Sequence, residues 1–358
     1  MMERKFNFSA GPGVLPIEVL REAQEEMLCY KDAAASVMEI SHRSRQYTEI
    51  TDSANSILRD LLGLDNNWHI LFLQGGASLQ FYQAPLNFLT GQTCADYLIT
   101  GKWAEGAFQQ GQLIGDARTA ASSADLNHSY IPDVDSWKIS DGSAYLHVTS
   151  NNTIFGTQLQ ADPTVSVPMI CDASSDFLSR PIEMEKYGLM YAGAQKNIGP
   201  AGATVVLVRQ DFLDRIPSGL PKLLDYGTHV KSLYHTPPVF AVYMVEKVLR
   251  WIKNMGGLAQ MKAHNDKKAG HLYSKIDGSD FYKGVARPDS RSNMNVTYRL
   301  PTEDLENLFV KEAAAHGLMS LKGHRSAGGI RASIYNACPM EAVESLVSFM
   351  GHFENQNG

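Results

Sequence analysis

One lysine in this 358-residue sequence follows a short apolar run and a row of small residues, an arrangement that could hold a reactive amine. The apolar run covers residues 189–192, and residues 193–195 separate it from Lys196. Small residues follow again at 199–202, so a bulky group could approach the backbone there. The amine of Lys196 would point into that space and could form a covalent bond with a carbonyl compound. The alternative is a solvated lysine in a surface turn.

A carboxylate occupies a similar position elsewhere in the same half of the chain. Asp172 comes directly after the apolar run 167–171. Because the carboxyl ends of parallel strands face the ligand crevice of an α/β sheet, Asp172 could lie beside Lys196. A carboxylate there would favour the protonated form of a ring nitrogen. The alternative is an aspartate that caps a helix.

Two more features complete a possible cofactor site. The turn Gly75-Gly76-Ala77-Ser78 lies between an apolar run and a helix predicted over residues 79–89, where backbone N–H groups favour a phosphate. Trp103 follows another apolar run and could stack on a planar ring. Taken singly, these features also fit a ligand-free turn and a packing tryptophan. Together with Lys196 and Asp172 they supply an amine, a pyridinium partner, a phosphate cup and a stacking face, which indicates pyridoxal 5'-phosphate.

The elements that position these residues alternate between strands and helices. Continuous apolar runs at 69–73, 96–99, 144–148, 167–171, 189–192 and 204–208 predict strands buried on both faces of a largely parallel sheet. A helix with a 3.6-residue apolar stripe is predicted over 50–62. Residues 211–240 are rich in proline and glycine and predict a long surface connection, followed by a helix over 240–255. Predicted strands at 293–299 and 330–334 and a last helix around 343–353 indicate a smaller α+β domain.

Composition excludes several classes of protein. Hydrophobic residues make up 44% and charged residues 20%, and the net charge of -6 predicts no nucleic-acid partner. The cysteines are too widely spaced for a disulfide framework or a zinc site, and no metal is expected; they are Cys29, Cys94, Cys171 and Cys338. No apolar signal segment and no run of about 18 apolar residues is visible, which predicts a cytoplasmic protein without a membrane partner.

Longer stretches of the chain resemble the phosphoserine-transaminating branch of the class V pyridoxal-phosphate aminotransferases, which have fold type I. These stretches run from near the N-terminus to the last quarter of the chain; they are residues 6–12, 37–43, 178–181, 191–202, 235–238 and 322–336. The resemblance implies an α/β fold with a mostly parallel, seven-stranded sheet covered by helices. It further implies a large cofactor-binding domain over residues 15–258 and a small α+β domain made of residues 1–14 and 259–358.

The resemblance also implies a role for each matched residue. Lys196 would hold the cofactor as an internal aldimine and act as the base, and Asp172 would pair with its ring nitrogen. The other cofactor-binding residues would be Ala77, Ser78, Trp103, Thr153 and Gln195, with His235 and Thr236 reaching the phosphate of the neighbouring subunit in a homodimer. The substrate would be bound by His42, Arg43, His324, Arg325 and Arg331, with Arg331 on the α-carboxylate.

Two matched positions depart from some members of the family, and one nearby arginine has no matched role. The turn Gly75-Gly76-Ala77-Ser78 stands where other members carry an arginine-containing turn, and His235 stands where others have asparagine. Arg45 is left as a surface residue. These departures bear on individual contacts rather than on the cofactor, because backbone N–H groups, a hydroxyl and an imidazole also bind phosphate.

The implied reaction is a reversible ping-pong transamination. It would interconvert O-phospho-L-serine and 2-oxoglutarate with 3-phosphohydroxypyruvate and L-glutamate in L-serine biosynthesis; formation of 4-phosphohydroxythreonine for pyridoxal phosphate synthesis stays open. Alternatives are another class V transferase, such as a serine or alanine–glyoxylate aminotransferase, or a cysteine desulfurase. The desulfurase would need a mobile reactive cysteine, whereas Cys338 is predicted to be buried. A further alternative is a cofactor scaffold without turnover, against which the presence of both Lys196 and Asp172 argues. A nicotinamide-binding protein would need Gly-x-Gly-x-x-Gly after the first strand, and Gly75-Gly76-Ala77 does not supply that spacing.

Overall fold

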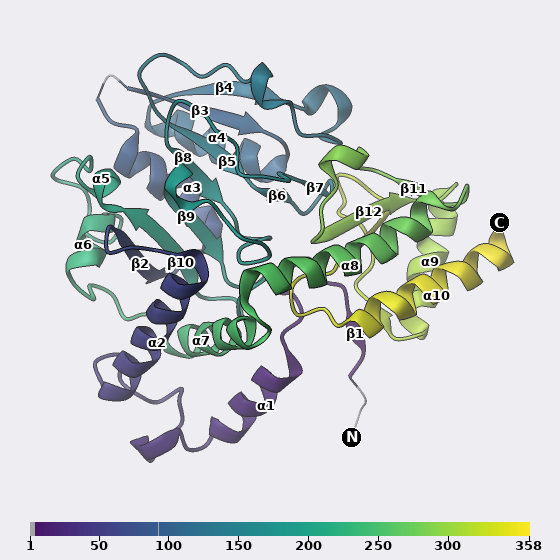
Figure 1. Cartoon of the computed structure of the whole chain (residues 1–358), viewed down its shortest axis with the longest axis horizontal. Coiled ribbons are helices and arrows are strands. Elements are labelled where there is room, and N and C mark those ends of the chain that lie inside the picture. The colour runs from purple at the N-terminus through teal and green to yellow at the C-terminus, as the bar shows by residue number, and fades with distance from the viewer. Residues whose placement is uncertain (1–3, 92) are drawn as a thin grey trace.

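The computed structural model describes residues 4–91 and 93–358, so the first three residues of the predicted segment 1–14 lie outside it. A seven-stranded sheet forms the centre of the larger lobe (Figure 1). The spatial order is β2 (Trp68–Leu73), β10 (Thr204–Arg209), β9 (Tyr187–Gly193), β8 (Met169–Asp172), β5 (Ser143–Thr149), β3 (Cys94–Ile99) and β4 (Asp116–Ser122). Five of its strands, β9, β8, β5, β3 and β4, pair with each other in parallel, and β10 is antiparallel to both of its neighbours, β2 and β9. The prediction of a mostly parallel α/β sheet is confirmed.

Helices cover both faces of this sheet, which explains why its strands are continuously apolar. Along β9, Leu189 and Tyr191 pack toward one face and Met190 and Ala192 toward the other, and all four are buried. The face of Met190 is covered by α1 (Ile17–Glu26), α2 (Arg45–Leu62) and α7 (Val239–Asn254). The other face is covered by α3 (Gly76–Phe88), α4 (Lys102–Ile114), α5 (Gln210–Leu213) and α6 (Tyr226–Lys231).

Three local predictions for this lobe need correction. The predicted surface connection over 211–240 contains α5 and α6, because Phe212 and Tyr226 are fully buried under the sheet. Strand β4 carried no apolar run and was not predicted, since it is a largely exposed edge strand. Strand β8 begins at Met169, after Pro168, and includes Asp172 as its last residue.

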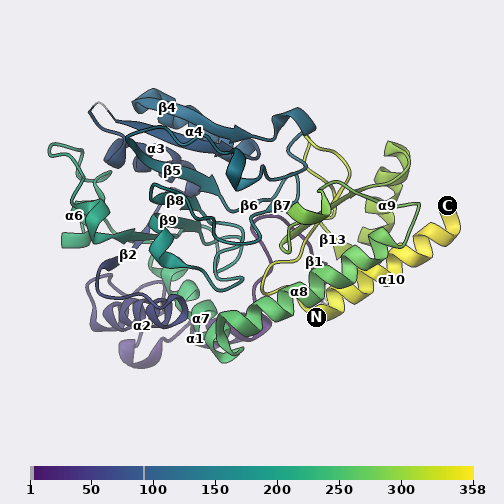
Figure 2. The same cartoon turned by 45° about the horizontal axis from the view of Figure 1, so that its top comes forward.

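The smaller lobe is an α+β arrangement with its own core. Strands β11 (Lys283–Gly284), β12 (Asn295–Arg299) and β14 (Ile330–Ser333) form an antiparallel sheet, and β1 (Phe6–Asn7) pairs with β13 (Leu318–Met319). The helices are α8 (Gly257–Asp277), α9 (Glu303–Ala315) and α10 (Met340–Asn357), and α8 lies alongside α10 in both views (Figures 1 and 2). The strand predicted over 293–299 and the helix predicted around 343–353 are thus confirmed within a few residues.

Helix α8 connects the two lobes. Leu258 and Met261 at its start belong to the core of the larger lobe, whereas Ala269 and Leu272 belong to the smaller core. Phe8 also packs into the smaller core, so the N-terminal strand returns to the C-terminal half of the chain. The division at residues 14/15 and 258/259 stays a prediction.

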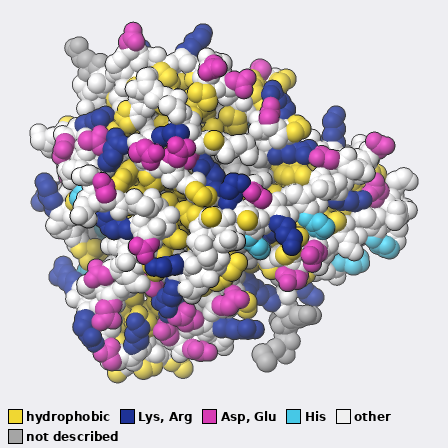
Figure 3. Space-filling view, viewed as in Figure 1, with side chains coloured by type: hydrophobic (Ala, Val, Ile, Leu, Met, Phe, Trp, Pro, Cys, Tyr) yellow, Lys and Arg dark blue, Asp and Glu magenta, His cyan; other side chains and the backbone are white. Residues whose placement is uncertain are grey.

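Short elements complete the described chain. A two-stranded ribbon, β6 (Asn151–Asn152) with β7 (Thr157–Gln158), follows β5. Single 3-10 turns cover Lys31–Ala33, Ala124–Leu126, Val134–Ser136, Met184–Lys186 and Pro288–Ser290. Within the described ranges, none of the helices combines the length and apolarity needed to cross a bilayer. On the face drawn in Figure 3, acidic and basic side chains are interspersed.

Candidate active site

Lys196 lies in the turn that follows β9, half-buried and above an aromatic ring. Its Nζ is 5.4 Å from the centre of the Trp103 ring. The N-terminal segment packs on this turn: the backbone N of Gly13 donates to the carbonyl of Gln195 at 2.7 Å. A side chain at Gly13 would lie 2.6 Å from the Lys196 carbonyl, so only glycine permits this approach. The N-terminal segment therefore holds the backbone of the turn in place.

The electrostatic surroundings of Lys196 favour a neutral amine. Burial lowers the pKa of Lys196, the nearby Asp172 carboxylate opposes this, and the Arg331 guanidinium adds to the lowering. Lys196 takes part in none of the ion pairs formed among the described residues. A buried lysine with a depressed pKa and no carboxylate partner is the form that nucleophilic and base catalysis require.

Asp172 ends β8 beside the lysine turn. It is only 5% exposed, and its Oδ1 accepts a hydrogen bond from the backbone N of Ser174 at 3.0 Å. Strand pairing places Asp172 opposite Tyr191, close to the end of β9. The predicted convergence of Asp172 and Lys196 at the carboxyl ends of adjacent strands is thus observed in the geometry.

The turn before α3 can bind an anion. Gly75 and Gly76 have φ of +88° and +63°, the left-handed region that glycine adopts without strain. No side chain caps the N-terminus of α3, so the backbone N–H groups of its first turn, at Ala77 and Ser78, remain available. The partial positive charge of the helix end favours a phosphate at this point.

A chain of hydrogen bonds links Trp103 to Arg331. Trp103 Nε1 donates to Thr153 Oγ1 at 3.0 Å, and Arg331 Nη1 donates to the Thr153 carbonyl at 3.1 Å. Burial lowers the pKa of Arg331, and no ion pair within the described residues includes it. We call Lys196, Asp172, Trp103, Thr153 and Arg331 the lysine cluster. It brings together an amine, a carboxylate, a ring and a guanidinium that bonds a carbonyl but no carboxylate among the described residues.

His324 and Arg325 lie near the guanidinium end of the lysine cluster. Burial and the charges of Arg331 and Arg325 lower the pKa of His324, whose Nδ1 shares a hydrogen bond of 2.7 Å with Ser326 Oγ. Arg325 is exposed. Three groups able to carry positive charge therefore stand together, as a site for a dianionic substrate would require.

The remaining predicted residues gather elsewhere, and we call His42, Arg43, His235 and Thr236 the histidine face. His42 and His235 line one cavity of about 200 Å³, and Thr236 lines another of about 490 Å³ with His42. Neither cavity is lined by Lys196 or Trp103. Both ring nitrogens of His235 are buried, with no hydrogen-bond partner within the described part of the chain. Arg43 is exposed, and Arg45 pairs with Asp32 and Glu49 at the surface.

Sequence reasoning missed two polar residues beside Asp172. Ser174 Oγ accepts a hydrogen bond from the backbone N of Gly193 at 3.0 Å, which ties the Asp172 loop to the end of β9. Asp176 is buried and accepts from Ser150 Oγ and, at 3.0 Å, from Gln158 Nε2. Burial raises the pKa of Asp176. The polar run 172–176 directly after an apolar strand was a signal that could have indicated them.

The fold and the lysine cluster are those of a pyridoxal-phosphate transferase of the aminotransferase type. The family model described as Aminotransferase class-V matches residues 5–346. The chain therefore belongs to the class-V aminotransferase family.

Particular relatives narrow this placement. The chain is 50% identical to a phosphoserine aminotransferase of Geobacillus kaustophilus, over 99% of both chains. A solved structure of phosphoserine aminotransferase from Bacillus circulans subsp. alkalophilus matches over the whole of both chains with 50% identity and a TM-score of 0.97. A structure of phosphoserine aminotransferase with bound PLP from Trichomonas vaginalis matches with 41% identity and a TM-score of 0.93, covering 97% of this chain and 100% of the other.

Proposed function

We propose that this chain is a pyridoxal-phosphate-dependent aminotransferase that acts on O-phospho-L-serine. The reaction interconverts O-phospho-L-serine and 2-oxoglutarate with 3-phosphohydroxypyruvate and L-glutamate, a step of L-serine biosynthesis. The observation that carries this proposal is an unpaired, half-buried Lys196 over the Trp103 ring, with Asp172 and Arg331 in its electrostatic surroundings. Relatives that are named for the same activity, and that are 50% identical over at least 99% of both chains, support it.

The residues present fit pyridoxal phosphate. Lys196 has no competing ion pair, α3 begins without a side-chain cap, and Trp103 is 37% exposed, so a ring could reach its face. When bound, the cofactor supplies an electron sink for the α-carbon of an amino acid. Its holders would be Lys196 for the aldehyde and Asp172 for the ring nitrogen; the remaining contacts would come from Ala77, Ser78, Trp103, Thr153 and Gln195.

Lys196 moves the proton. The Nζ of Lys196 would take the α-proton of the bound amino acid and pass it on toward the cofactor, whose electron sink would accept the electron pair of the broken C–H bond. Only a neutral amine can accept a proton, and burial lowers the pKa of Lys196 in this direction. The Asp172 side chain would lie beside the ring nitrogen, where a carboxylate favours the protonated ring.

Arginines hold the two anionic ends of the substrate. The guanidinium of Arg331 is planar and unpaired, so it can bind the α-carboxylate through two parallel hydrogen bonds. His324 and Arg325 would receive the distal phosphate of phosphoserine or the distal carboxylate of glutamate. We assign His42 and Arg43 to the same distal anion, supplied by a neighbouring subunit.

A homodimer is part of this proposal. His235 and Thr236 would donate hydrogen bonds to the cofactor phosphate held by the partner chain. The support is that both ring nitrogens of His235 are buried without a partner in a single chain, which costs stability unless another molecule satisfies one of them. A cytoplasmic location belongs to the same proposal and rests on the sequence alone.

The other class V chemistry considered, cysteine desulfuration, has little support. Cys338 is 1% exposed, and burial raises its pKa to about 11, so the reactive thiolate is scarce at neutral pH. A transferase for an unphosphorylated amino acid differs in one testable respect: it has no use for so many cationic groups around the distal end of the substrate.

The deciding experiment compares glutamate with 3-phosphohydroxypyruvate against glutamate with unphosphorylated hydroxypyruvate. We expect kcat/KM to be higher by at least about 100-fold for the phosphorylated acceptor, because the cations at the distal end would stay unpaired against the uncharged hydroxyl of hydroxypyruvate. Equal turnover of both acceptors would favour another class V transferase. The same assay with 4-phosphohydroxythreonine as amino donor tests whether the pyridoxal phosphate pathway shares this enzyme.

A further inference from the structure

Four buried polar side chains join the two lobes behind the lysine cluster, and no role has been assigned to them above. They are Asn197, Asn265, Lys268 and Asn336, and each is at most 5% exposed. We call them the amide hub. Burying polar side chains destabilises a fold unless they are hydrogen-bonded, so these four side chains need partners inside the protein.

Asn336 is the centre of the amide hub. Its backbone N donates to Asn197 Oδ1 at 2.9 Å, and its Nδ2 donates to the carbonyl of Leu178 at 3.1 Å. Its Oδ1 accepts from Asn265 Nδ2 at 2.8 Å. One residue of the smaller lobe thus bonds the lysine turn, the Asp172 loop and helix α8.

The Asp172 loop presents three successive carbonyls to the hub. The carbonyls of Phe177, Leu178 and Ser179 accept from three different asparagine side chains; these are Asn197 at 2.8 Å, Asn336 at 3.1 Å and Asn265 at 3.1 Å. Leu178 has a φ of +59°, a left-handed conformation that costs a residue with a Cβ about 1 kcal/mol. The three hydrogen bonds hold the loop in this strained conformation.

Lys268 holds the strand side of the hub. It lies one helical turn beyond Asn265 on α8, and its Nζ donates to the carbonyls of Ile334 at 3.0 Å and Tyr335 at 2.6 Å. Burial lowers the pKa of Lys268 to about 8. These carbonyls belong to the segment that directly follows β14, the strand that carries Arg331. Helix α8 therefore sets the position of that strand end.

The hub touches each of the three segments that carry the chemistry. Asn197 is the residue after Lys196, the loop 177–179 continues from Asp172, and Asn336 follows the strand of Arg331. An amino acid must reach Lys196 and Arg331 at the same time, with its α-carbon at one and its carboxylate at the other. A misplacement of about 1 Å in such an arrangement can cost about 100-fold in rate.

We propose that Asn336 is a positioning residue that sets the separation between Arg331 and Lys196. The proposal rests on the proposed function, because it takes the roles of Lys196 and Arg331 from it. The side chain of Asn336 is 1% exposed and bonds Leu178 and Asn265, so it would act through other residues. It holds the Arg331 segment against the Asp172 loop and α8, while the backbone N–H of Asn336, which Asn336→Ala keeps, bonds the Lys196 turn.

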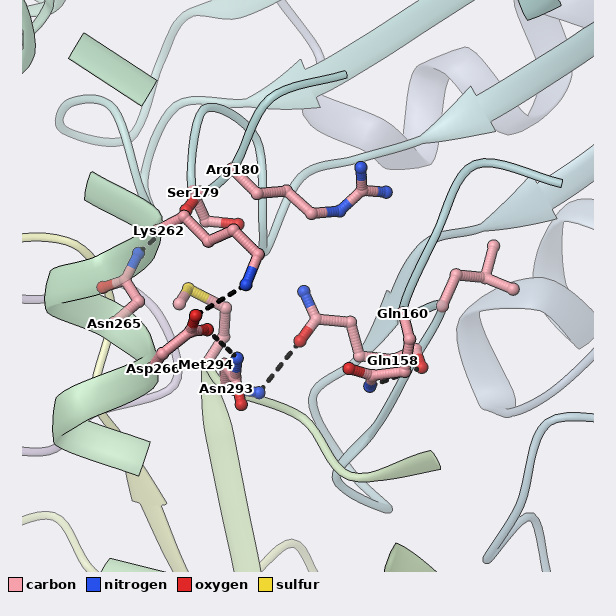
Figure 4. A pocket seen from close by; sticks show the side chains of 10 residues that line it. Gln158, Gln160, Ser179, Arg180, Lys262, Asn265, Asp266, Asn293 and Met294 are labelled. Atoms are coloured by element: carbon pink, nitrogen blue, oxygen red, sulfur yellow. Dashed lines mark hydrogen bonds and ion pairs between the residues drawn. The ribbon is translucent and has the colours of Figure 1, made fainter. Parts of the chain in front are cut away.

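A cavity lies beside the hub. About 80 Å³ of space separates α8 from the loops of the larger lobe, and Ser179, Asn265 and Asp266 line it (Figure 4). Lys262 and Asp266 also line the cavity and form an ion pair with an N–O distance of 2.6 Å. Because both residues lie on α8, this pair does not connect the lobes. The backbone N of Asn293 donates to Gln158 Oε1 at 2.9 Å beside this cavity, so polar contacts join the lobes on this side, and the hub is one set of them.

The test compares Asn336→Ala and Asn265→Ala with a matched control, Asn87→Ala. Asn87 is equally buried and makes two donor bonds, to the carbonyls of Gln83 at 2.8 Å and Leu224 at 2.7 Å, but both lie within the larger lobe. Asn265→Ala removes the same contact from the α8 side, so it serves if Asn336→Ala does not fold. All variants are purified with cofactor and compared with the unmodified chain.

We expect kcat for both phosphoserine and glutamate to fall about 10- to 100-fold in Asn336→Ala and Asn265→Ala. The visible band of bound cofactor and the dissociation constant of glutarate, an unreactive dicarboxylate, should stay within about twofold, because glutarate has no α-amino group to align with Lys196. The double variant should lose less than the product of the two single losses, since Asn265 and Asn336 share one contact and each also bonds its own carbonyl of the same loop. Asn87→Ala should lower thermal stability while kcat stays within about twofold.

Two results would overturn the inference. One is a folded Asn336→Ala with unchanged kcat for both donors. The other is glutarate affinity falling in step with kcat, which would mean a collapse of the whole site rather than a change in spacing. An inactive unmodified chain would instead overturn the proposed function, so the two failures are distinguishable.

Discussion

The lysine cluster and the histidine face differ in how completely one chain satisfies their polar groups. In the lysine cluster, Thr153 accepts two hydrogen bonds: its Oγ1 accepts from the indole of Trp103, and its carbonyl accepts from the guanidinium of Arg331. On the histidine face, both ring nitrogens of His235 are buried without a partner. Hydrogen bonds within one chain therefore connect most of the lysine cluster. The histidine face has unsatisfied groups of the kind that our proposal assigns to contact with a neighbouring chain.

The largest effect is expected from removing the amine of the lysine cluster. Lys196→Ala should lower kcat by about 10,000-fold or more, because both the covalent anchor and the base are lost. Borohydride treatment should no longer attach cofactor to the peptide that contains residue 196. Lys262→Ala, at a half-exposed lysine of α8, is the control and should keep full activity. Residual turnover with labelling of that same peptide would remove Lys196 from the mechanism.

The next effect concerns the other end of the lysine cluster. Arg331→Lys should keep the visible absorbance of bound cofactor but lower kcat/KM about 100- to 1,000-fold for both phosphoserine and glutamate, because a lysine cannot replace the bidentate hydrogen bonds. Steady-state kinetics with each donor measures this. A loss confined to one donor would place Arg331 at the distal anion instead of the α-carboxylate.

A smaller effect is expected from Lys268 of the amide hub, in the way the stability of the fold depends on pH. Burial lowers the pKa of Lys268 from 10.5 to about 8. Between these two pH values the unfolded chain binds more protons than the folded chain, so the contribution of Lys268 to the free energy of unfolding rises with pH. Chemical denaturation at pH 7.5 and 10.5 should show a gain on the order of 3 kcal/mol for the unmodified chain relative to Lys268→Met. Parallel pH profiles would show that Lys268 has an ordinary pKa.

The smallest effect tests the histidine face. His235→Ala should weaken cofactor binding about tenfold, through the loss of one hydrogen bond to a charged phosphate. Mixed dimers of His235→Ala and Lys196→Ala chains sharpen this test. If His235 serves the partner, one site of each mixed dimer has both residues intact, and activity at limiting cofactor should exceed that of either parent. No gain on mixing would place His235 and Lys196 in the same chain's site.

Much of the lysine cluster could be predicted because local patterns carry it. An apolar run ending at a polar residue marks the carboxyl end of a buried strand, and both Asp172 and Lys196 were located in this way. The edge strand β4 escaped prediction because its side chains are largely exposed and form no apolar run. The burial of Phe212 and Tyr226 also escaped, since single aromatics in a polar stretch give no period. The domain boundaries and the roles of the site residues stay predictions.

The amide hub shows the limit of such patterns. Asn336 and Asn197 are 139 residues apart in sequence, and Asn265 and Asn336 are 71 apart. An asparagine has no hydropathy signal that distinguishes a buried hub from a solvated turn, because its preference depends on which partners the fold brings to it.

The amino-acid sequence alone determined the α/β class, the order of the main strands and the residue types that indicate pyridoxal phosphate, since these depend on periodicity and on chemistry close along the chain. Only the tertiary structure decided which side chains share a space. It joined Arg331 to Thr153 and Trp103, tied the lobes through Asn336, and placed His42 and His235 in a cavity that Lys196 does not line. The physical reason is that hydrogen bonds and charge interactions fall off within a few ångströms, and distances of that kind between remote residues are set by the packing of the whole chain.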